Sequence, residues 1–522
     1  MAEEIPPEGD PEWSELQERQ GLDPLGMQNT SIALYQAMLP GISNVTLRVR
    51  YYAFHSWISR EYARLHHSPE ADHWCVFLRR CEALYALVAQ QHAQAAGVGG
   101  SRWAGNTLKG LKGNRVRFSV NTDRQAPDQY LAQKFGTFGA AYSSQMAVLG
   151  LLQEAQKHDL PVTSVRGTKL ASDFAASVGS AADVFLEGVR RGSVTLEELQ
   201  QLGAFAPSGI ELDSDERETY EELLLAPQAG PDTLAAKRRH SLRLVLHTAD
   251  ALGRTPDALE VRWMAYSGFD DEGNPLVPLR GADAACRYQW RVYHANDLMH
   301  VCHEALLRFT LEALERHPNG VRIGALLEEV AGRLIDGAGD APASWGELED
   351  SLVVPENAWG EDENNEWYLA DDLLSFRIED ALSAETAFAA IRLLATLARR
   401  FEPELGAVQQ VLHGIAHDTS QTVLTELRFL ARRRDAPLKA TITALIKQRI
   451  LDRHQLVAFQ KLRGGDYTFL FEVEDGLVRP RKKAGPVFTN PRLRSAISFL
   501  TDIHLLGTDG LTARGRQVLE AA

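Results

Sequence analysis

The sequence predicts a mainly α-helical, multi-domain protein with a small β-hairpin close to its C-terminus. The chain has 522 residues, of which 44% are hydrophobic, so it can bury several separate cores. Apolar residues recur at helical spacing through residues 175–330, 376–400 and 405–434. The clearest strand signal is residues 467–473, rich in aromatic and β-branched side chains, and residues 476–478 supply a hairpin partner.

Composition favours a cytoplasmic protein that does not enter a membrane. The cysteines include no Cys-x-x-Cys pair and are too few for a disulfide framework, which fits reduced thiols in a bacterial-type cytosol. The first residues are acidic and lack an apolar core, so we expect no signal peptide. No run of eighteen apolar residues occurs, which argues against a membrane span. The four cysteines are Cys75, Cys81, Cys286 and Cys302.

Charge is distributed unevenly along the chain. The net charge is −15, yet the residues from Ala436 onward hold fourteen Lys and Arg side chains against eight Asp and Glu, a net of +6. The remainder therefore carries −21. A basic module on an acidic body is typical of nucleic-acid binding. The alternative is an acidic protein whose last domain happens to be basic.

Changes in composition divide the chain into six consecutive segments. A Pro- and Glu-rich leader, residues 1–20, is expected to be disordered. The acidic stretch 336–372 is typical of a solvated loop, although it could also mimic DNA or shield the basic end. The other segments are an N-terminal helical domain (21–175), a central helical domain (176–335), a helical segment (373–435) and a basic C-terminal domain (436–522).

The N-terminal domain opens with two predicted helices. One runs from about Thr30 to Met38 and is broken by Pro40; the other starts near Thr46. In the second helix, Arg48 and Arg50 lie beside paired tyrosines, where their guanidinium groups could hold a phosphate or carboxylate. Pairing with acids across a helix interface is the alternative that we favour.

One stretch of this domain carries a family resemblance. Residues 25–57 contain Leu-Gly, then Leu-Pro-Gly-Ile-x-Asn-Val-Thr-x-Arg-x-Arg-Tyr-Tyr-x-Phe-x-x-Trp. This pattern resembles the opening of an uncharacterised group of bacterial proteins, described as a domain of unknown function, from phage-defence and mobile-element neighbourhoods. A weaker similarity covers residues 454–493. The resemblance brings no catalytic residues; it implies a defence context and protein partners from the same locus.

A glycine-rich run, residues 97–113, follows a helix predicted over residues 71–96. Because it follows a helix and lacks a Gly-Lys-Ser/Thr ending, it is not a P-loop. Five cations in and just after this run could contact a nucleic-acid backbone. A plain surface connection is the alternative that we favour. These cations are Arg102, Lys109, Lys112, Arg115 and Arg117.

Two short patterns predict winged-helix-like modules, one near each end of the chain. In the C-terminal pattern, a helix opened by Thr489 ends in Leu-Leu at 505–506, and residues 511–515 (Leu-Thr-Ala-Arg-Gly) turn into a final helix. This order resembles the closing half of a winged helix-turn-helix domain. Residues 149–152 and 162–167 repeat it, with three residues between Thr and Gly where the C-terminal copy has two.

The predicted nucleic-acid contacts are cations of the C-terminal domain. Arg492 and Arg494 stand at the start of its helix, where a winged helix meets DNA. The corresponding helix of the N-terminal copy, around residues 142–145, has no basic residue and is predicted to be structural. A basic loop would clamp the DNA backbone without reading its sequence. The full set is Arg479, Arg481, Lys482, Lys483, Arg492, Arg494, Arg514 and Arg516.

Two histidine clusters are weak candidates for a metal site. Asp297, His300 and Glu304 share one helix face, but match neither His-Glu-x-x-His nor its inverse. His413 and His417 are spaced one helical turn apart, with no third ligand in sight. Buried, hydrogen-bonded histidines are the better explanation. No Walker, Rossmann or hydrolase motif occurs, so neither a metal nor a cofactor is predicted.

These observations favour a non-enzymatic, DNA-associated subunit of a bacterial anti-phage defence or mobile-element system. It would bind duplex DNA with weak sequence preference through the basic C-terminal module. One alternative is a scaffold or assembly subunit that holds protein partners and binds no DNA. Another is a metal-dependent nuclease or hydrolase built on the histidine clusters.

Overall fold

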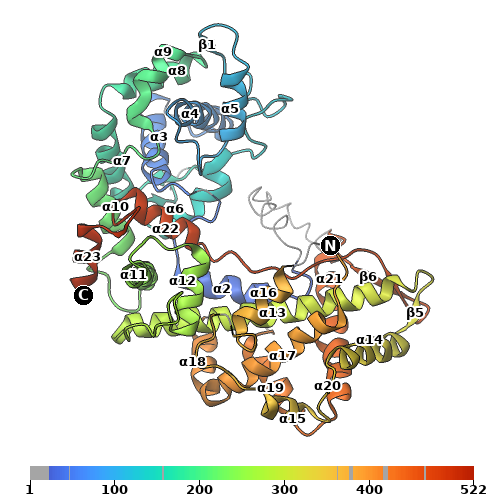
Figure 1. Ribbon diagram of the computed structural model, residues 1–522. Coiled ribbons are helices and arrows are strands. Elements are labelled where there is room, and N and C mark those ends of the chain that lie inside the picture. Colours follow the sequence, from blue (N-terminus) through green and yellow to red (C-terminus); the bar gives the residue numbers. More distant parts are fainter. Residues whose placement is uncertain are drawn as a thin grey trace, which may run out of the picture. The chain divides into compact units, whose positions relative to one another are not determined.

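The computed structural model describes residues 23–45, 47–66, 68–155, 158–360, 362–375, 380–415, 421–463 and 466–521. This part of the chain is mainly α-helical, with a few short sheets and a hairpin towards the C-terminus, as predicted (Figure 1). None of its helices combines the length and the apolar character that a membrane span requires. The predicted leader, residues 1–20, lies outside the described residues.

The chain forms two compact units whose segments alternate along the sequence. Of the described residues, unit 1 takes Leu39–Ala258 and the chain from Arg492 onward. Unit 2 takes the chain up to Met38 and Leu259–Pro491. The six consecutive segments predicted from the sequence do not coincide with these units. In particular, residues 436–522 are shared between the two.

Aromatic side chains from several helices build the core of unit 1. Phe54 of α3 stacks on Tyr85 of α4 with ring centroids 4.3 Å apart, and Phe185 of α8 stacks on Phe205 at 4.4 Å. α3 begins at Tyr51, later than the sequence predicts.

The elements of unit 1 are α3 (Tyr51–Leu65), α4 (Ala71–Gln91), α5 (Ser101–Lys109), β1 (Arg115–Val116), η1 (Phe138–Tyr142), α6 (Ser143–Val148), β2 (Leu152–Gln153), β3 (Val162–Thr163), α7 (Val165–Val178), α8 (Ala181–Arg191), β4 (Val194–Thr195), α9 (Leu196–Gln201), η2 (Leu202–Phe205), α10 (Asp215–Leu225), α11 (Leu234–Leu252), α22 (Leu493–Asp502), β8 (Leu506–Gly507), β9 (Gly510–Leu511) and α23 (Ala513–Glu520).

The two predicted modules share one helix–hairpin–helix geometry. α6 leads into the antiparallel pair β2–β3 and then α7, and α22 leads into β8–β9 and then α23. The final helix of each is capped by a side-chain oxygen that accepts from a glycine N–H: Ser164 from Gly167, and Thr512 from Gly515. Ser164, and not Thr163, is thus the counterpart of Thr512, which removes the one-residue mismatch seen in the sequence.

The start of α22 differs from the sequence prediction. Thr489 does not cap this helix, because its backbone N–H and hydroxyl both hydrogen-bond to Asp297 within unit 2. The residue at the cap position is Arg492, in a left-handed conformation (φ 66°) and without a side-chain cap. The helix therefore begins at Leu493.

Unit 2 is organised around the long helix α13 (Gly281–Glu315). Residues 292–314 of α13 are buried on almost every face, as expected for a helix enclosed by others. The helices α2, α14, α16, α17 and α19 pack against it. The other elements of unit 2 are α2 (Gln28–Met38), α12 (Ala258–Ser267, whose first residue belongs to unit 1), β5 (Val321–Arg322), α14 (Ile323–Gly337), α15 (Trp345–Ser351), α16 (Glu366–Leu374), α17 (Ala384–Phe401), η3 (Glu402–Glu404), α18 (Leu405–Ile415), α19 (Val423–Ala431), α20 (Leu438–Ala444), η4 (Leu445–Leu451), α21 (Asp452–Arg463), β6 (Phe471–Glu474) and β7 (Leu477–Pro480).

The predicted C-terminal hairpin is confirmed as β6–β7, which β5 extends to a three-stranded antiparallel sheet. The first strand is shorter than predicted, since it begins at Phe471 and not at Tyr467.

The acidic stretch 336–372 is not a loop throughout. It contains the helices α15 and α16, both anchored by buried side chains. Trp345 is fully buried and donates its indole N–H to Glu349 (2.6 Å). Glu366 is also fully buried and forms an ion pair with Arg400. Some of the acids that predicted a solvated loop are therefore internal ion-pair partners.

Candidate functional site

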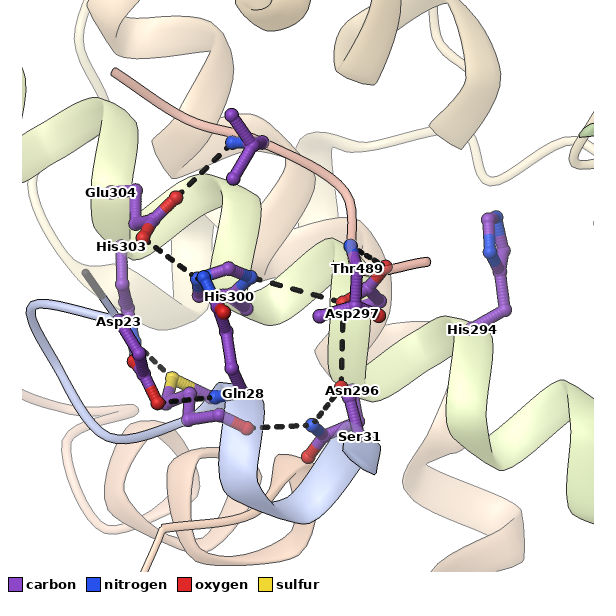
Figure 2. Close-up of polar contacts among 12 residues, drawn as sticks. Asp23, Gln28, Ser31, His294, Asn296, Asp297, His300, His303, Glu304 and Thr489 are labelled. Atoms are coloured by element: carbon purple, nitrogen blue, oxygen red, sulfur yellow. Dashed lines mark hydrogen bonds and ion pairs between the residues drawn. The ribbon is translucent and has the colours of Figure 1, made fainter. Parts of the chain in front are cut away.

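A run of polar side chains lies buried at the centre of α13 (Figure 2). Burial of polar groups is tolerated when other groups satisfy them. Here the partners come from α2, α12, α19 and the segment 487–489. The buried residues of α13 are His294, Asn296, Asp297, His300, His303 and Glu304.

Asp297 is the most heavily bonded group of this cluster. Its carboxylate accepts hydrogen bonds from the Arg262 guanidinium (2.6 Å) and from the Thr489 backbone N–H (3.0 Å) and hydroxyl (2.9 Å). Ser31 of α2 donates to it at 3.3 Å. One carboxylate therefore ties α12, α2 and the segment 487–489 to α13.

His300 lies between two carboxylates. Its Nε2 is 2.9 Å from Glu304, and its Nδ1 is 3.8 Å from Asp297. The second oxygen of Glu304 accepts from the Val487 backbone N–H at 3.1 Å. The side-chain nitrogen of Gln28 lies 3.4 Å from His300 Nε2 (Figure 2). These contacts fasten the same segments a second time.

The charges of this cluster are matched. Burial opposes ionisation of Asp297, but Arg262 and His300 together outweigh burial and hold the pKa of Asp297 below its ordinary value. Burial likewise opposes the charge of His300, but Glu304 and Asp297 raise the pKa of His300 well above its ordinary value. Burial raises the pKa of Glu304 above its ordinary value, so Asp297, beside Arg262, is the carboxyl group next to His300 that is held ionised.

The carboxyl group of Glu426, on α19, has fewer charged partners to offset its burial. Burial raises its pKa to about 7 although Arg449 lies 3.3 Å away. The nearby His303 stays neutral, because burial lowers its pKa to about 3. Glu426 is therefore a buried carboxyl group that titrates close to neutral pH.

The weak candidate trio for a metal, Asp297, His300 and Glu304, is a group of buried charged neighbours. Among the described residues, no group of three His, Cys, Asp or Glu side chains is arranged to hold a metal ion. Asp297, His300 and Glu304 are brought together, but their polar atoms face one another and the N–H groups of their neighbours. His413 is exposed on α18, and His417 lies outside the described residues. The cluster thus has the character of a structural clasp.

The two arginines of the N-terminal motif have internal partners in unit 1. Arg50 is fully buried and forms a bidentate pair with Glu216 (2.9 Å for both bonds), and its third nitrogen donates to two backbone carbonyls. Arg48 lies 3.2 Å from Asp502. The alternative of acids across a helix interface describes both residues. All three nitrogens of Arg50 are used, so the predicted role in binding an external anion has no support there.

Three of the four predicted cations around β7 are paired with glutamates of unit 2. Arg479 and Lys483 each lie 2.7 Å from a glutamate, Glu474 and Glu315 respectively. Arg481 pairs with Glu472 and lies over the ring of Tyr467. Lys482 is exposed, and the described residues give its side chain no partner.

Of the four predicted cations in unit 1, two have internal partners and two are exposed. Arg492 is buried and donates to Gln145 at 3.3 Å, so it cannot reach DNA from this conformation. Arg514 makes a bidentate pair with Glu221 (2.5 and 3.0 Å). Arg494 and Arg516 are exposed, and no described residue pairs with them. Of the eight predicted contacts, three are left exposed without a partner in the described chain.

A second group of cations in unit 1 was given less weight by the sequence analysis. All five are exposed, on α5, in the loop that follows it, on β1 and directly after β1. Within the described chain, the side chain of Arg115 bonds to the Ser193 hydroxyl at 3.3 Å and interacts with the charge of Glu198, and the side chains of the other four make no hydrogen bond or ion pair. We call residues 102–117 the cationic segment. Its members are Arg102, Lys109, Lys112, Arg115 and Arg117.

A sequence signal for this segment exists. Residues 83–122 contain no aspartate or glutamate, in a chain that has 70 of them. Forty residues of average composition would hold about five acids, so the local absence is informative. Counting charge over whole domains hides it, because acids of the preceding and following stretches cancel the cations.

Comparison with protein-family models, curated proteins and solved structures finds no match to this chain. The geometry of the chain itself is therefore the basis of the functional proposal.

Proposed function

We propose that this chain is a non-enzymatic, nucleic-acid-associated protein that contacts the phosphate backbone through the cationic segment of unit 1. The observation that carries the proposal is five exposed cations within a forty-residue stretch free of acids. Cations that are not neutralised by nearby carboxylates are free to replace the counterions of a polyanion.

The arrangement of the cations suits backbone contact. Arg102 and Lys109 are seven residues apart, so they point from the same side of α5. Lys112, Arg115 and Arg117 continue the positive charge into β1. Contacts to the phosphate backbone carry no sequence information, so we expect weak sequence preference.

The C-terminal cations have a smaller part in this proposal than the sequence suggested. Lys482, Arg494 and Arg516 are exposed, but they are divided between the two units. The winged-helix-like character of α22, β8–β9 and α23 belongs to the proposal too. It is weakened because Arg492, at the start of the expected recognition helix, is buried.

The biological setting rests on the resemblance of residues 25–57 alone. We propose a bacterial anti-phage defence or mobile-element system, with protein partners from the same locus. A cytoplasmic location follows from that setting.

Two charge-reversal variants test the contact surface. R102E/K109E/K112E should weaken binding to a 20-base-pair duplex by about tenfold or more at low salt, because each reversal removes a phosphate contact and adds a repulsion. The matched control K482E/R494E/R516E changes the net charge equally and should weaken binding much less. Electrophoretic mobility shifts at two salt concentrations measure both, and equal loss in the two variants would reject the surface.

A scaffold function is the second candidate, and one observation favours it. Leu456, Phe459 and Leu462 form an apolar stripe on α21 and are 47%, 57% and 41% exposed. Exposed apolar side chains at helical spacing are typical of protein contacts. A stable partner that co-purifies with the chain, without retention of nucleic acid, would support this candidate; L456S/F459S should then release that partner.

A further inference from the structure

Unit 1 contains a cleft of about 840 Å³ between α4 and the chain segment 119–134. Cations outnumber acids in its lining by four to two. A cleft lined mainly by positive charge concentrates anions, because its protein walls exclude the solvent that would screen the charge. The charged residues are Arg79, Arg80, Arg124, Lys134, Asp72 and Asp123.

Arg79 holds the cleft together without being neutralised. Its guanidinium is almost fully buried and donates to the backbone carbonyls of Thr122 (2.7 Å), Leu131 (2.9 Å) and Gln133 (2.5 Å). The wall residues Thr122 and 131–133 are thereby held to α4. Among the described residues, no carboxylate forms an ion pair with Arg79, so its full positive charge remains.

Arg80, the next residue of α4, is incompletely bonded. Its Nη1 lies 3.5 Å from the carbonyl oxygens of Val189 and Arg190, at the limit of a hydrogen bond. Its Nε is buried, and no hydrogen-bond partner for it occurs in the described chain. Its Nη2 has no hydrogen-bond partner among the described residues and is not buried, so it can donate to an anion in the cleft.

In the sequence, the cationic segment leads into one wall of the cleft. Ser119 and Thr122, which line it, follow Arg117 in the chain and end the acid-free stretch. Arginine forks suit the oxygens of a doubly charged phosphate.

We propose that this cleft binds a phosphate monoester, the terminal phosphate of a nucleic-acid strand, with Arg79 and Arg80 supplying the charge. The proposal rests on the proposed function for its ligand. The two acids of the cleft oppose an anion, and Asp123 accepts from the Gln125 backbone N–H (2.9 Å) at the exposed side.

The test compares oligonucleotides of one sequence that end in a 5′-phosphate, a 3′-phosphate or hydroxyls only, by fluorescence anisotropy at fixed salt. A terminal phosphate should tighten binding by about tenfold, the usual worth of a charged hydrogen bond. R80A should abolish this preference, R80K should retain part of it, and D123N should increase it. The control R190A removes an exposed arginine that pairs with Glu187 on α8, and it should leave the preference unchanged.

The outcomes separate this inference from the proposed function. Equal affinity for all three oligonucleotides, with binding retained, would overturn the cleft and leave the cationic segment intact. Calorimetry with inorganic pyrophosphate supplies the second arm. Pyrophosphate binding that R80A weakens, without oligonucleotide binding, would keep the phosphate chemistry but reject the nucleic-acid source. If neither R80A nor D123N changes the binding of the phosphorylated oligonucleotides or of pyrophosphate, the inference is overturned.

Discussion

The Arg50–Glu216 pair illustrates how charged residues are used in this chain. Both side chains are fully buried in unit 1, so each loses its hydration on folding. A buried pair is not a strong source of net stability, but loss of one partner leaves a buried charge uncompensated. The pair therefore specifies how α3 meets α10.

We predict that R50M destabilises unit 1 by about 3–5 kcal/mol, because it strands the Glu216 carboxylate. The double variant R50M/E216L should recover most of that loss. Urea unfolding followed by circular dichroism measures both. As a control, R190M breaks an exposed pair and should change the free energy of unfolding much less. A change below 1 kcal/mol for R50M would contradict the structural role.

Glu426 predicts a pH dependence of unit 2. The pKa of this group is about 7 in the folded chain, above its ordinary value, so the folded state binds the proton more tightly than the unfolded state. Its contribution to stability is therefore full at pH values below its ordinary pKa and falls as pH rises towards 7.

The variant E426Q imitates the protonated carboxyl group and should be more stable than the parent chain at pH 8, by about 1–3 kcal/mol. At pH 4 the two should be similar. Thermal unfolding at both pH values checks this difference. A parent chain that gains stability relative to E426Q between pH 4 and pH 8 would show that Arg449 holds the carboxylate ionised.

At the scale of elements, the repeated helix–hairpin–helix depends on one glycine in each copy. A Cβ atom at Gly167 would collide with the carbonyl oxygen of Leu151, and one at Gly515 with that of Leu505. Those carbonyls accept the backbone N–H groups of Ser164 (2.9 Å) and Thr512 (3.2 Å). Close approach of backbone to backbone therefore explains the glycine shared by both patterns.

We predict that G167A and G515A each destabilise unit 1 by about 2–4 kcal/mol, since backbone must shift to admit the methyl group. The control is G324A in α14, where a Cβ atom meets nothing within 4 Å and a better helix former should stabilise by about 0.5–1 kcal/mol. Chemical unfolding of the three variants gives the comparison. If G167A and G515A leave the free energy of unfolding unchanged, the close backbone contacts at the two hairpins do not stabilise unit 1.

The elements were more predictable than the site. Helical periodicity located α2, α4 and α22 to within a few residues, and the aromatic strand located β6, because local spacing decides which face is buried. The recurring Leu-Leu and cap pattern identified a true repeat. The helices within residues 336–372 were missed because their acids, among them Glu349 and Glu366, are paired with arginines distant in the sequence.

The partners of charged side chains cannot be read from local sequence. Arg48 pairs with Asp502, more than 450 residues later, and Arg514 pairs with Glu221. The C-terminal cations therefore looked available for DNA, although four of the eight are paired with acids. The cationic segment could be predicted in principle, because an absence of acids is local information.

At the scale of the whole molecule, a net charge of −15 opposes nucleic-acid binding at long range. Binding then requires a surface where positive charge is locally unbalanced. Unit 1 provides it at α5 and β1, while the paired cations near β7 in unit 2 contribute little. The proposed polyanion contact therefore lies in unit 1. The buried cluster on α13, in unit 2, has a structural role.

The salt dependence of duplex binding tests this account most directly. For the parent chain, log K should fall linearly with log salt concentration, with a slope of about −3 to −5 if the five cations of the cationic segment replace counterions. R102A/K109A/K112A should reduce the magnitude of this slope by about 2–3, whereas K482A/R494A/R516A should leave the slope nearly unchanged. A parent slope near zero, or equal changes in the two triple variants, would contradict the central claim.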